Sequence, residues 1–222
     1  MNAVDDARLD ETKLQAASSP SGEGCPPEKK PVPVGKIWTE AEESCLFSYF
    51  RKPIRNVDPL ARVCLRQVHD LIRGEVFCKP TFELRALKDE GEARSFKANN
   101  FDYVTFSGLF SRRDAKSLIQ HSGLLCIDFD HLEDPVGLKK ALIRDKFFET
   151  QLAFISPSGH GLKWVIPIEV SPLVTHEKWF TAVRNYIEQA YKVNVDPSGR
   201  DVARACFLPH DPDVYLNPKL LL

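Results

Sequence analysis

The spacing of apolar residues divides the chain into a polar N-terminal stretch and a patterned remainder. Residues 1–36 have little apolar periodicity and contain clusters of Ser, Pro and Gly, which is typical of a disordered arm. Residues 37–222 are expected to form one domain. Within it we expect an N-terminal α/β elaboration over 37–122 and a core over 123–218.

The first part of the folded region predicts one helix and one strand. Asp58 is the expected N-cap, Pro59 the first helical residue and Gly74 the end of a helix with apolar residues at helical spacing. Residues 75–100 are charged and mixed, without a clear period. Residues 101–106 predict a strand.

From Gly123 onward the pattern is clearer, because strand-like and helix-like segments alternate. The predicted elements are a strand at 123–129, a helix at 134–147, strands at 152–155 and 162–168, a helix at 175–191 and a strand at 203–208. This β-α-β-β-α-β order predicts an α+β fold of the split βαβ, ferredoxin-like or RRM-like kind. Such a fold supports many functions, so function must be argued from side chains.

Two acidic residues lie two positions apart at the end of the apolar run 123–129. Asp128 lies within the run, and Asp130 directly follows it. Asp128 and Asp130 should project to the same face of a strand, where like charges repel and lose hydration. A divalent cation between them would remove this conflict. The alternative is that the strand end already lies in solvent, where acids are readily tolerated.

A second candidate site is a glycine-rich turn. Ser158, Gly159 and His160 belong to it, and Lys163 follows in the next predicted strand. Glycine lets backbone N–H groups approach an anion closely, and a lysine nearby can meet a phosphate as a point charge. The alternative is an ordinary hairpin with a solvated lysine and a surface histidine.

A third candidate site combines an acid and an arginine near the C-terminus. Asp196 ends an extended piece and would complete a carboxylate cluster with Asp128 and Asp130. Arg204 lies among apolar neighbours, so it needs a phosphate or a carboxylate as partner. The alternative is that Asp196 only starts a turn with the proline that follows it.

Composition excludes several classes of protein. The net charge of −1 rules out a uniformly basic nucleic-acid coat, although Lys and Arg outnumber Asp and Glu between Arg51 and Lys116. The six cysteines include no C-x-x-C pair, which argues against a zinc ribbon or a redox dithiol and favours a reducing, cytoplasmic setting. No apolar run is long enough to span a bilayer, so no membrane partner is expected.

Together the three candidate sites resemble the motifs of the archaeo-eukaryotic primase (primase-polymerase) superfamily. Its Asp-x-Asp strand corresponds to Asp128 and Asp130, its glycine-bearing turn with a basic residue to 158–163, and its third acid with a downstream arginine to Asp196 and Arg204. The stretches 103–132 and 206–218 resemble more closely the N-terminal domain of virulence-associated-E-like, BT4734-type proteins of mobile elements. The likeness covers roughly residues 45–218.

This resemblance implies an RRM-like primase palm that transfers nucleotides from an NTP or dNTP to a nucleic-acid 3′-hydroxyl. Asp128, Asp130 and Asp196 would be the catalytic residues and would bind Mg²⁺ or Mn²⁺. The nucleotide would be bound by Ser158, Gly159, His160, Lys163 and Arg204. Arg112 and Arg113 are the candidates for contacts to the DNA template or primer. A helicase-like ATPase, in the same chain or a separate one, is the further expected partner.

One departure from the superfamily pattern keeps an alternative open. Many primase-polymerases carry histidine where this chain has Lys163, and the zinc module of several primases is missing. A lysine can neutralise a phosphate but is not a neutral donor near pH 7. The alternative is therefore a primase-like module that binds nucleic acid without synthesis. A weaker one is the Asp-x-Asp metal site of a glycosyltransferase or phosphodiesterase.

Overall fold

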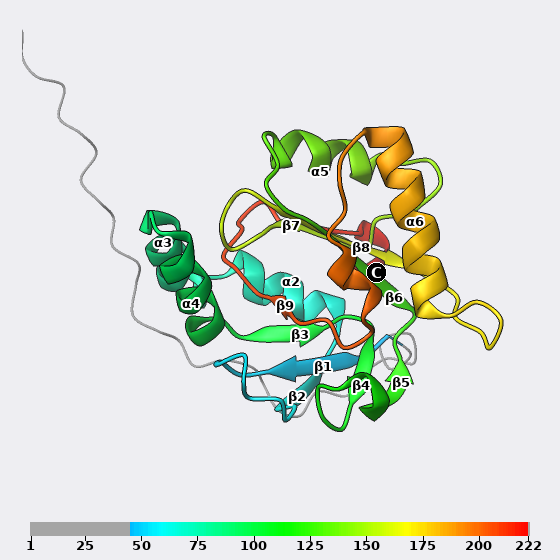
Figure 1. Cartoon of the computed structure of the whole chain (residues 1–222), viewed down its shortest axis with the longest axis horizontal. Helices are drawn as coiled ribbons and strands as arrows, with labels where there is room; N and C mark the ends of the chain where they lie inside the picture. The colour runs from blue at the N-terminus through cyan, green and yellow to red at the C-terminus, as the bar shows by residue number, and fades with distance from the viewer. Residues whose placement is uncertain (1–44, 222) are drawn as a thin grey trace, which may run out of the picture.

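Two four-stranded antiparallel sheets form the centre of the protein, whose computed structural model describes residues 45–221 (Figure 1). The first sheet has the order β2-β1-β3-β9 and consists of β2 (Ala61–Val63), β1 (Phe47–Phe50), β3 (Tyr103–Thr105) and β9 (Cys206–Phe207). The second has the order β10-β7-β8-β6 and consists of β10 (Tyr215–Leu216), β7 (Leu152–Ile155), β8 (Leu162–Pro167) and β6 (Leu124–Phe129). A separate hairpin is formed by β4 (Gly108–Phe110) and β5 (Leu118–His121). The expected α+β class is confirmed.

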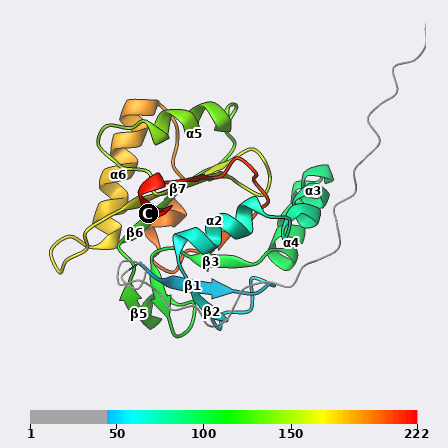
Figure 2. The same cartoon turned by 180° about the vertical axis from the view of Figure 1, so that it is seen from behind.

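Helices cover the second sheet and fill the space beside the first. The described helices are α2 (Leu65–Arg73), α3 (Cys78–Ala86), α4 (Glu90–Asn100), α5 (Pro135–Ile143) and α6 (His176–Tyr191). Figures 1 and 2 show α5 and α6 together on the outer face of the second sheet, with α3 and α4 side by side at one flank. Within residues 45–221, no helix combines the length and the apolar character needed to cross a bilayer.

The alternation of side chains along β6 and β8 divides the core in two. Leu125 and Ile127 of β6 and Trp164 of β8 belong to the cluster that packs against α5 and α6. Leu124 of β6 and Val165 of β8 belong to the cluster shared with α2 and the first sheet. This facing follows the two-residue period of a strand. It places Asp128 and Lys163 in the layer between the two sheets.

Helix α6 was well predicted, and α5 ends earlier than expected. Thr175 is the N-cap of α6, and its hydroxyl accepts the N–H of Lys178 at 3.4 Å. Asp134 caps α5 by accepting the N–H of Gly137 at 2.8 Å. The helix stops at Ile143, because Asp145 accepts the N–H groups of the residues expected to continue it, 147 and 148.

The N-terminal part was predicted less well. The expected helix from Asp58 is instead the short strand β2 followed by α2, which begins after Cys64. The apolar residues there fit both the helical and the strand spacing. The segment forms a strand because Val63 pairs with Phe47 in β1. The stretch 75–100, which gave no clear period, contains α3 and α4, and Asp89 caps α4.

The last predicted strand does not complete an RRM-like sheet. It is reduced to β9, which pairs with β3 of the first sheet rather than with β6. The 3₁₀ turn η2 (Pro197–Arg200) lies against β6 instead, and a Cβ on Gly199 would be 3.3 Å from the Cys126 carbonyl oxygen. Because proline has no N–H, this segment cannot add a regular strand to that edge.

The predicted domain parts meet in one core. Residues of the expected elaboration (37–122) and of the expected core (123–218) both contribute to the cluster between the sheets, and β9 pairs with β3 across that boundary. The described region therefore does not divide into two independent packing units at residue 122. The predicted arm, residues 1–36, lies outside the described residues.

Candidate metal and phosphate site

The site is centred on a buried ion pair between two strands. Asp128 of β6 lies directly opposite Lys163 of β8, both side chains are buried, and the Lys163 ammonium contacts Asp128 Oδ1. Burial alone would lower the pKa of Lys163, but the carboxylate of Asp128 outweighs it and raises that pKa above its ordinary value. Lys163 therefore stays charged at neutral pH.

Two further carboxylates converge on Asp128. Asp130 follows the end of β6 and is exposed. Asp196 is brought beside β6 by its backbone N–H, which donates to the Asp128 carbonyl oxygen at 2.9 Å. Each of the three residues offers an oxygen, and these oxygens lie within 4.8 Å of one another. The three acids that the sequence grouped are thus together.

Asp196 also has the turn-forming role that was considered as its alternative. It caps η2 by accepting the backbone N–H of Ser198 at 2.9 Å and its hydroxyl at 2.6 Å. Burial raises the pKa of Asp196, but these bonds from Ser198, with the positive charge of Arg204, lower it overall. The cap therefore holds the carboxylate ionised and fixes its orientation toward Asp128.

Arg204 joins two of the acids from the other side. Its Nη2 lies 3.0 Å from Asp196 Oδ2 and 3.6 Å from Asp128 Oδ2. It precedes β9 rather than lying within it, and 43% of its side chain is exposed. Arg204 has carboxylate partners, as expected, and its exposed part remains accessible to an anion.

The glycine-rich turn lies against the same end of β6. The backbone N–H of Leu132 donates to the His160 carbonyl oxygen at 2.8 Å. A Cβ on Gly161 would lie 2.5 Å from the Phe129 carbonyl oxygen and 3.3 Å from Asp130 Oδ1, so only glycine permits this approach. Ser158 and His160 are exposed beside the carboxylates, and Gly159 has φ +85°.

An arginine that sequence reasoning missed holds this turn from α3. Arg85 Nε donates to the Pro157 carbonyl oxygen at 3.2 Å, and its Nη2 donates to that of Ser156 at 3.4 Å. A Cβ on Gly159 would lie 3.3 Å from Arg85 Nε. Arg85 thus positions the turn, and its helix lies in the stretch where the sequence gave no clear period.

A second missed residue, Lys97 in the last turn of α4, faces the site. Its ammonium lies 5.9 Å from the centroid of the Phe207 ring in β9. Burial lowers the pKa of Lys97, the positive charge of Lys163 lowers it further, and the charges of Asp130 and Asp128 oppose this. The sequence signal that could have identified Lys97 was its position, next to Phe96, in the last turn of the helix that Asp89 caps.

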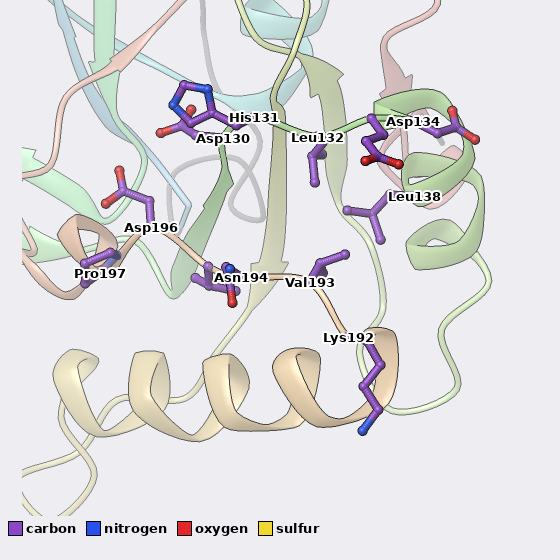
Figure 3. A pocket seen from close by; sticks show the side chains of 12 residues that line it. Asp130, His131, Leu132, Asp134, Leu138, Lys192, Val193, Asn194, Asp196 and Pro197 are labelled. Atoms are coloured by element: carbon purple, nitrogen blue, oxygen red, sulfur yellow. The ribbon is translucent and has the colours of Figure 1, made fainter.

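A groove of about 770 Å³ opens beside the carboxylates (Figure 3). Asp130 and Asp196 lie at one end, and Lys192 lies at the other. Leu132 and Val193 line the part between them. The groove therefore joins a charged end to a partly apolar wall, which suits a ligand with both an anionic and a planar or apolar part.

The two arginines expected to bind nucleic acid, Arg112 and Arg113, have different surroundings. Arg113 donates to the Tyr103 hydroxyl at 3.1 Å and to the Ile54 carbonyl oxygen at 3.2 Å. Arg112 is exposed. Within residues 45–221, neither forms an ion pair with the three acids. A nucleic-acid role for them stays a prediction, and Arg113 also has a structural role.

The donor set fits a hard divalent cation. Three carboxylates supply oxygen ligands at the spacing of a shared ion, and Asp130 leaves the cluster open to solvent. Mg²⁺ or Mn²⁺ would be held by Asp128, Asp130 and Asp196. Because the ammonium of Lys163 contacts Asp128, it competes with an ion for that oxygen.

The fold and the site define an α+β protein in which clustered carboxylates lie next to basic side chains and a glycine-rich turn. The chain matches the family described as BT4734-like, N-terminal domain, over residues 95–216, and it belongs to that family. The predicted BT4734-type resemblance is thereby confirmed. No curated protein and no solved structure matches the chain.

Proposed function

We propose that the protein is a primase-polymerase-like nucleotidyltransferase of a mobile element, which adds nucleotides from an NTP or dNTP to a nucleic-acid 3′-hydroxyl. The observation that carries this proposal is the convergence of Asp128, Asp130 and Asp196 within 4.8 Å, next to Lys163 and Arg204. Carboxylates that share a cation beside phosphate-binding cations are the arrangement that phosphoryl transfer requires.

Each part of the site has a separate task in this proposal. Asp128, Asp130 and Asp196 hold Mg²⁺ or Mn²⁺, which when bound supplies Lewis-acid stabilisation of the attacking and leaving oxygens. Arg204 and Lys163 neutralise the triphosphate of the incoming nucleotide. The turn 158–160 offers Ser158 and backbone N–H groups to the same phosphates.

The pair between Lys163 and Asp128 gives the site a resting state. Without ligands, the ammonium neutralises the most buried acid. A cation held by Asp128, Asp130 and Asp196 would displace the Lys163 ammonium from Asp128 and would free it to neutralise a phosphate. Binding of metal and of triphosphate is therefore positively coupled, because each ligand frees the side chain that the other ligand needs.

The order β6-α5-β7-β8-α6 supports an RRM-like palm, since β8 lies between β6 and β7 as in a split βαβ unit. We propose membership of the primase-polymerase superfamily on this order and on the positions of the acids. DNA is the proposed template and primer, and a helicase-like ATPase acts with the domain. The proposed compartment is the cytoplasm.

Primer extension tests this proposal. The wild type is incubated with a labelled primer–template, Mn²⁺ and either NTPs or dNTPs, and product length is read on a gel. Asp130→Asn should reduce extension at least about 100-fold, because it removes a cation ligand without disturbing a buried pair. Glu133→Gln, an exposed acid of the same groove, should extend like the wild type. A wild type that never extends any primer contradicts the proposal.

A primase-like module that binds nucleic acid without synthesis is the second candidate. It is favoured by Lys163, which stands at the position where many relatives of the proposed superfamily have histidine and is paired with Asp128. Measured DNA binding without extension by the wild type would support this candidate. If Lys163→His restores or increases primer extension, the lysine at this position lowers the activity of an enzyme that is still able to synthesise, and the binding-only candidate is rejected.

A further inference from the structure

Lys97 reaches the site from an element that none of the sequence motifs includes. It lies in the last turn of α4, and the chain then continues through Phe101 into β3. Strand β3 pairs with β9, whose Phe207 ring lies 5.9 Å from the Lys97 ammonium. The ammonium therefore lies next to β9, which Arg204 precedes by two residues, and close enough to Asp128, Asp130, Lys163 and Arg204 to interact with their charges. Figure 1 shows α4 close to β3 and β9.

The surroundings of Lys97 leave its charge without a carboxylate of its own. Within residues 45–221, Lys97 forms no ion pair, whereas Asp128 and Asp196 already contact Lys163 and Arg204. The side chain is half-buried. Burial and the positive charge of Lys163 lower the pKa of Lys97, the charges of Asp130 and Asp128 oppose this, and Arg204 lowers it further. A desolvated cation among other cations is stabilised when an anion binds between them.

The charges of the cluster indicate which anion fits. Three carboxylates face three cations, Lys97, Lys163 and Arg204, so the residues alone are balanced. Divalent cations on the carboxylates would release Lys163 and Arg204, and Lys97 has no carboxylate partner among residues 45–221 to begin with. The site would then have a surplus of positive charge on its β9 side, which only an anion with several charges or several contacts can neutralise.

We propose that Lys97 is a phosphate-binding residue, and that it forms with Lys163 and Arg204 a phosphate subsite on the β9 side of the carboxylates. This inference rests on the proposed function and names a further binding residue for it. The ligand is a phosphate group, either of the nucleoside triphosphate or of the nucleic-acid backbone. The ring of Phe207 positions the ammonium by holding the aliphatic stem and the charge over its face.

The test compares three variants of the full chain. Lys97→Gln removes the charge, Lys97→Arg keeps it, and Lys79→Gln removes an exposed lysine from the neighbouring helix α3, where 72% of the side chain is accessible. Affinities are measured by calorimetry for inorganic tripolyphosphate with Mg²⁺ and for a single-stranded DNA oligonucleotide without nucleotide. Thermal unfolding confirms that each variant is folded.

Lys97→Gln should weaken tripolyphosphate binding about 10-fold, Lys97→Arg should restore most of it, and Lys79→Gln should leave it unchanged. If DNA affinity falls instead while tripolyphosphate affinity stays constant, the subsite holds and its phosphate belongs to the backbone. Unchanged affinity for both ligands overturns the proposal, as does an equal loss in Lys79→Gln. Primer extension by the wild type is scored separately, so inactivity would reject the proposed function while the binding data still decide about Lys97.

Discussion

Within residues 45–221 the protein contains two buried lysine–aspartate pairs, and their surroundings differ. Lys139 of α5 lies 3.5 Å from Asp211, and Lys163 of β8 contacts Asp128. All four side chains are buried. The remaining hydrogen-bond partners of Asp211 are backbone groups, whereas the other partners of Asp128 are charged side chains.

The Asp211 pair is fully satisfied by the fold. Asp211 Oδ2 accepts the N–H of Ile155 at 2.7 Å, and its Oδ1 accepts that of Asp213 at 3.1 Å. Lys139 donates to the Asp213 carbonyl oxygen at 2.8 Å. These bonds tie the C-terminal segment to the end of β7, so the charges serve stability.

The Asp128 pair is the opposite case. Its neighbours include two acids and a second cation, and among residues 45–221 no backbone N–H donates to its carboxylate. Like charges held together without backbone support raise the free energy of the ligand-free state. Backbone groups complete the Lys139–Asp211 pair, which indicates a structural role, whereas the Lys163–Asp128 pair competes with other charges, which favours the proposed binding role.

The largest expected effect breaks the structural pair. Asp211→Asn should lower the free energy of unfolding by about 3–5 kcal/mol, because Lys139 loses its buried counter-charge. Asp128→Asn should cost below about 1.5 kcal/mol, since Asp196 and Asp130 remain near Lys163 and a repulsion is relieved. Urea unfolding of both variants measures the difference. Equal losses would show that the two pairs have the same role.

The next effect separates Lys163 from its partner. Lys163→Met should weaken tripolyphosphate binding about 10-fold and strengthen Mn²⁺ binding in the absence of nucleotide by a similar factor, because Asp128 is released. Lys140→Met, an exposed site on α5, is the control for the loss of one charge. Titration with Mn²⁺ monitored by electron paramagnetic resonance measures the Mn²⁺ affinity, and calorimetry with tripolyphosphate and Mg²⁺ measures the phosphate affinity. Weaker Mn²⁺ binding by Lys163→Met would contradict the claim that Lys163 competes with the ion for Asp128.

The smallest expected effect is a dependence of stability on pH, which arises from two histidines, His121 and His176, that support the site. The N–H of Gly123 donates to His121 Nδ1 at 3.0 Å, so His121 Nε2 carries the proton and donates to His176 Nδ1 at 3.1 Å. His176 Nε2 in turn donates to the carbonyl oxygen of Gly199 in η2 at 3.2 Å. Burial and the neighbouring His176 lower the pKa of His121 to about 4, and burial lowers that of His176. This neutral pair supports the turn that follows Asp196.

Because the unfolded chain binds protons near the ordinary histidine pKa of about 6.5 and the folded chain does not, stability should fall as pH decreases from about 6.5 toward 4. The loss is on the order of 1 kcal/mol, since His121 is partly exposed. Urea unfolding between pH 7.5 and 4.5 measures it. A His121→Asn variant should show a shallower loss, and His131→Gln, at an exposed site, should match the wild type. Identical pH profiles for all three would contradict the neutral pair.

The sequence predicted those parts of the site that depend on local pattern. The two-residue period of β6 and β8 gave the facing of Asp128 and Lys163, and the cap at Thr175 gave the start of α6. The convergence of Asp196 with Asp128 was predicted as well. Strand alternation and capping are local properties, so one sequence suffices to predict them.

What the sequence did not predict depends on tertiary pairing. Strand pairing determines the register that places Asp128 opposite Lys163. It also determines that β9 belongs to the first sheet rather than to the sheet that contains β6. Helices α3 and α4 are short and weakly amphipathic, so their period was not recognised and Arg85 and Lys97 were missed. Their side chains reach the site only because the helices lie along its flank.

The central claim is that the three carboxylates share a divalent cation, and Mn²⁺ binding tests it most directly. Mn²⁺ affinity is measured by calorimetry with and without a nucleoside triphosphate for the wild type, Asp130→Asn and the control Glu133→Gln. We predict Mn²⁺ binding by the wild type that is strengthened by the triphosphate, an affinity at least about 10-fold lower in Asp130→Asn, and no change in Glu133→Gln. A wild type that binds no Mn²⁺ under either condition, or an Asp130→Asn variant that binds it equally well, would contradict the account.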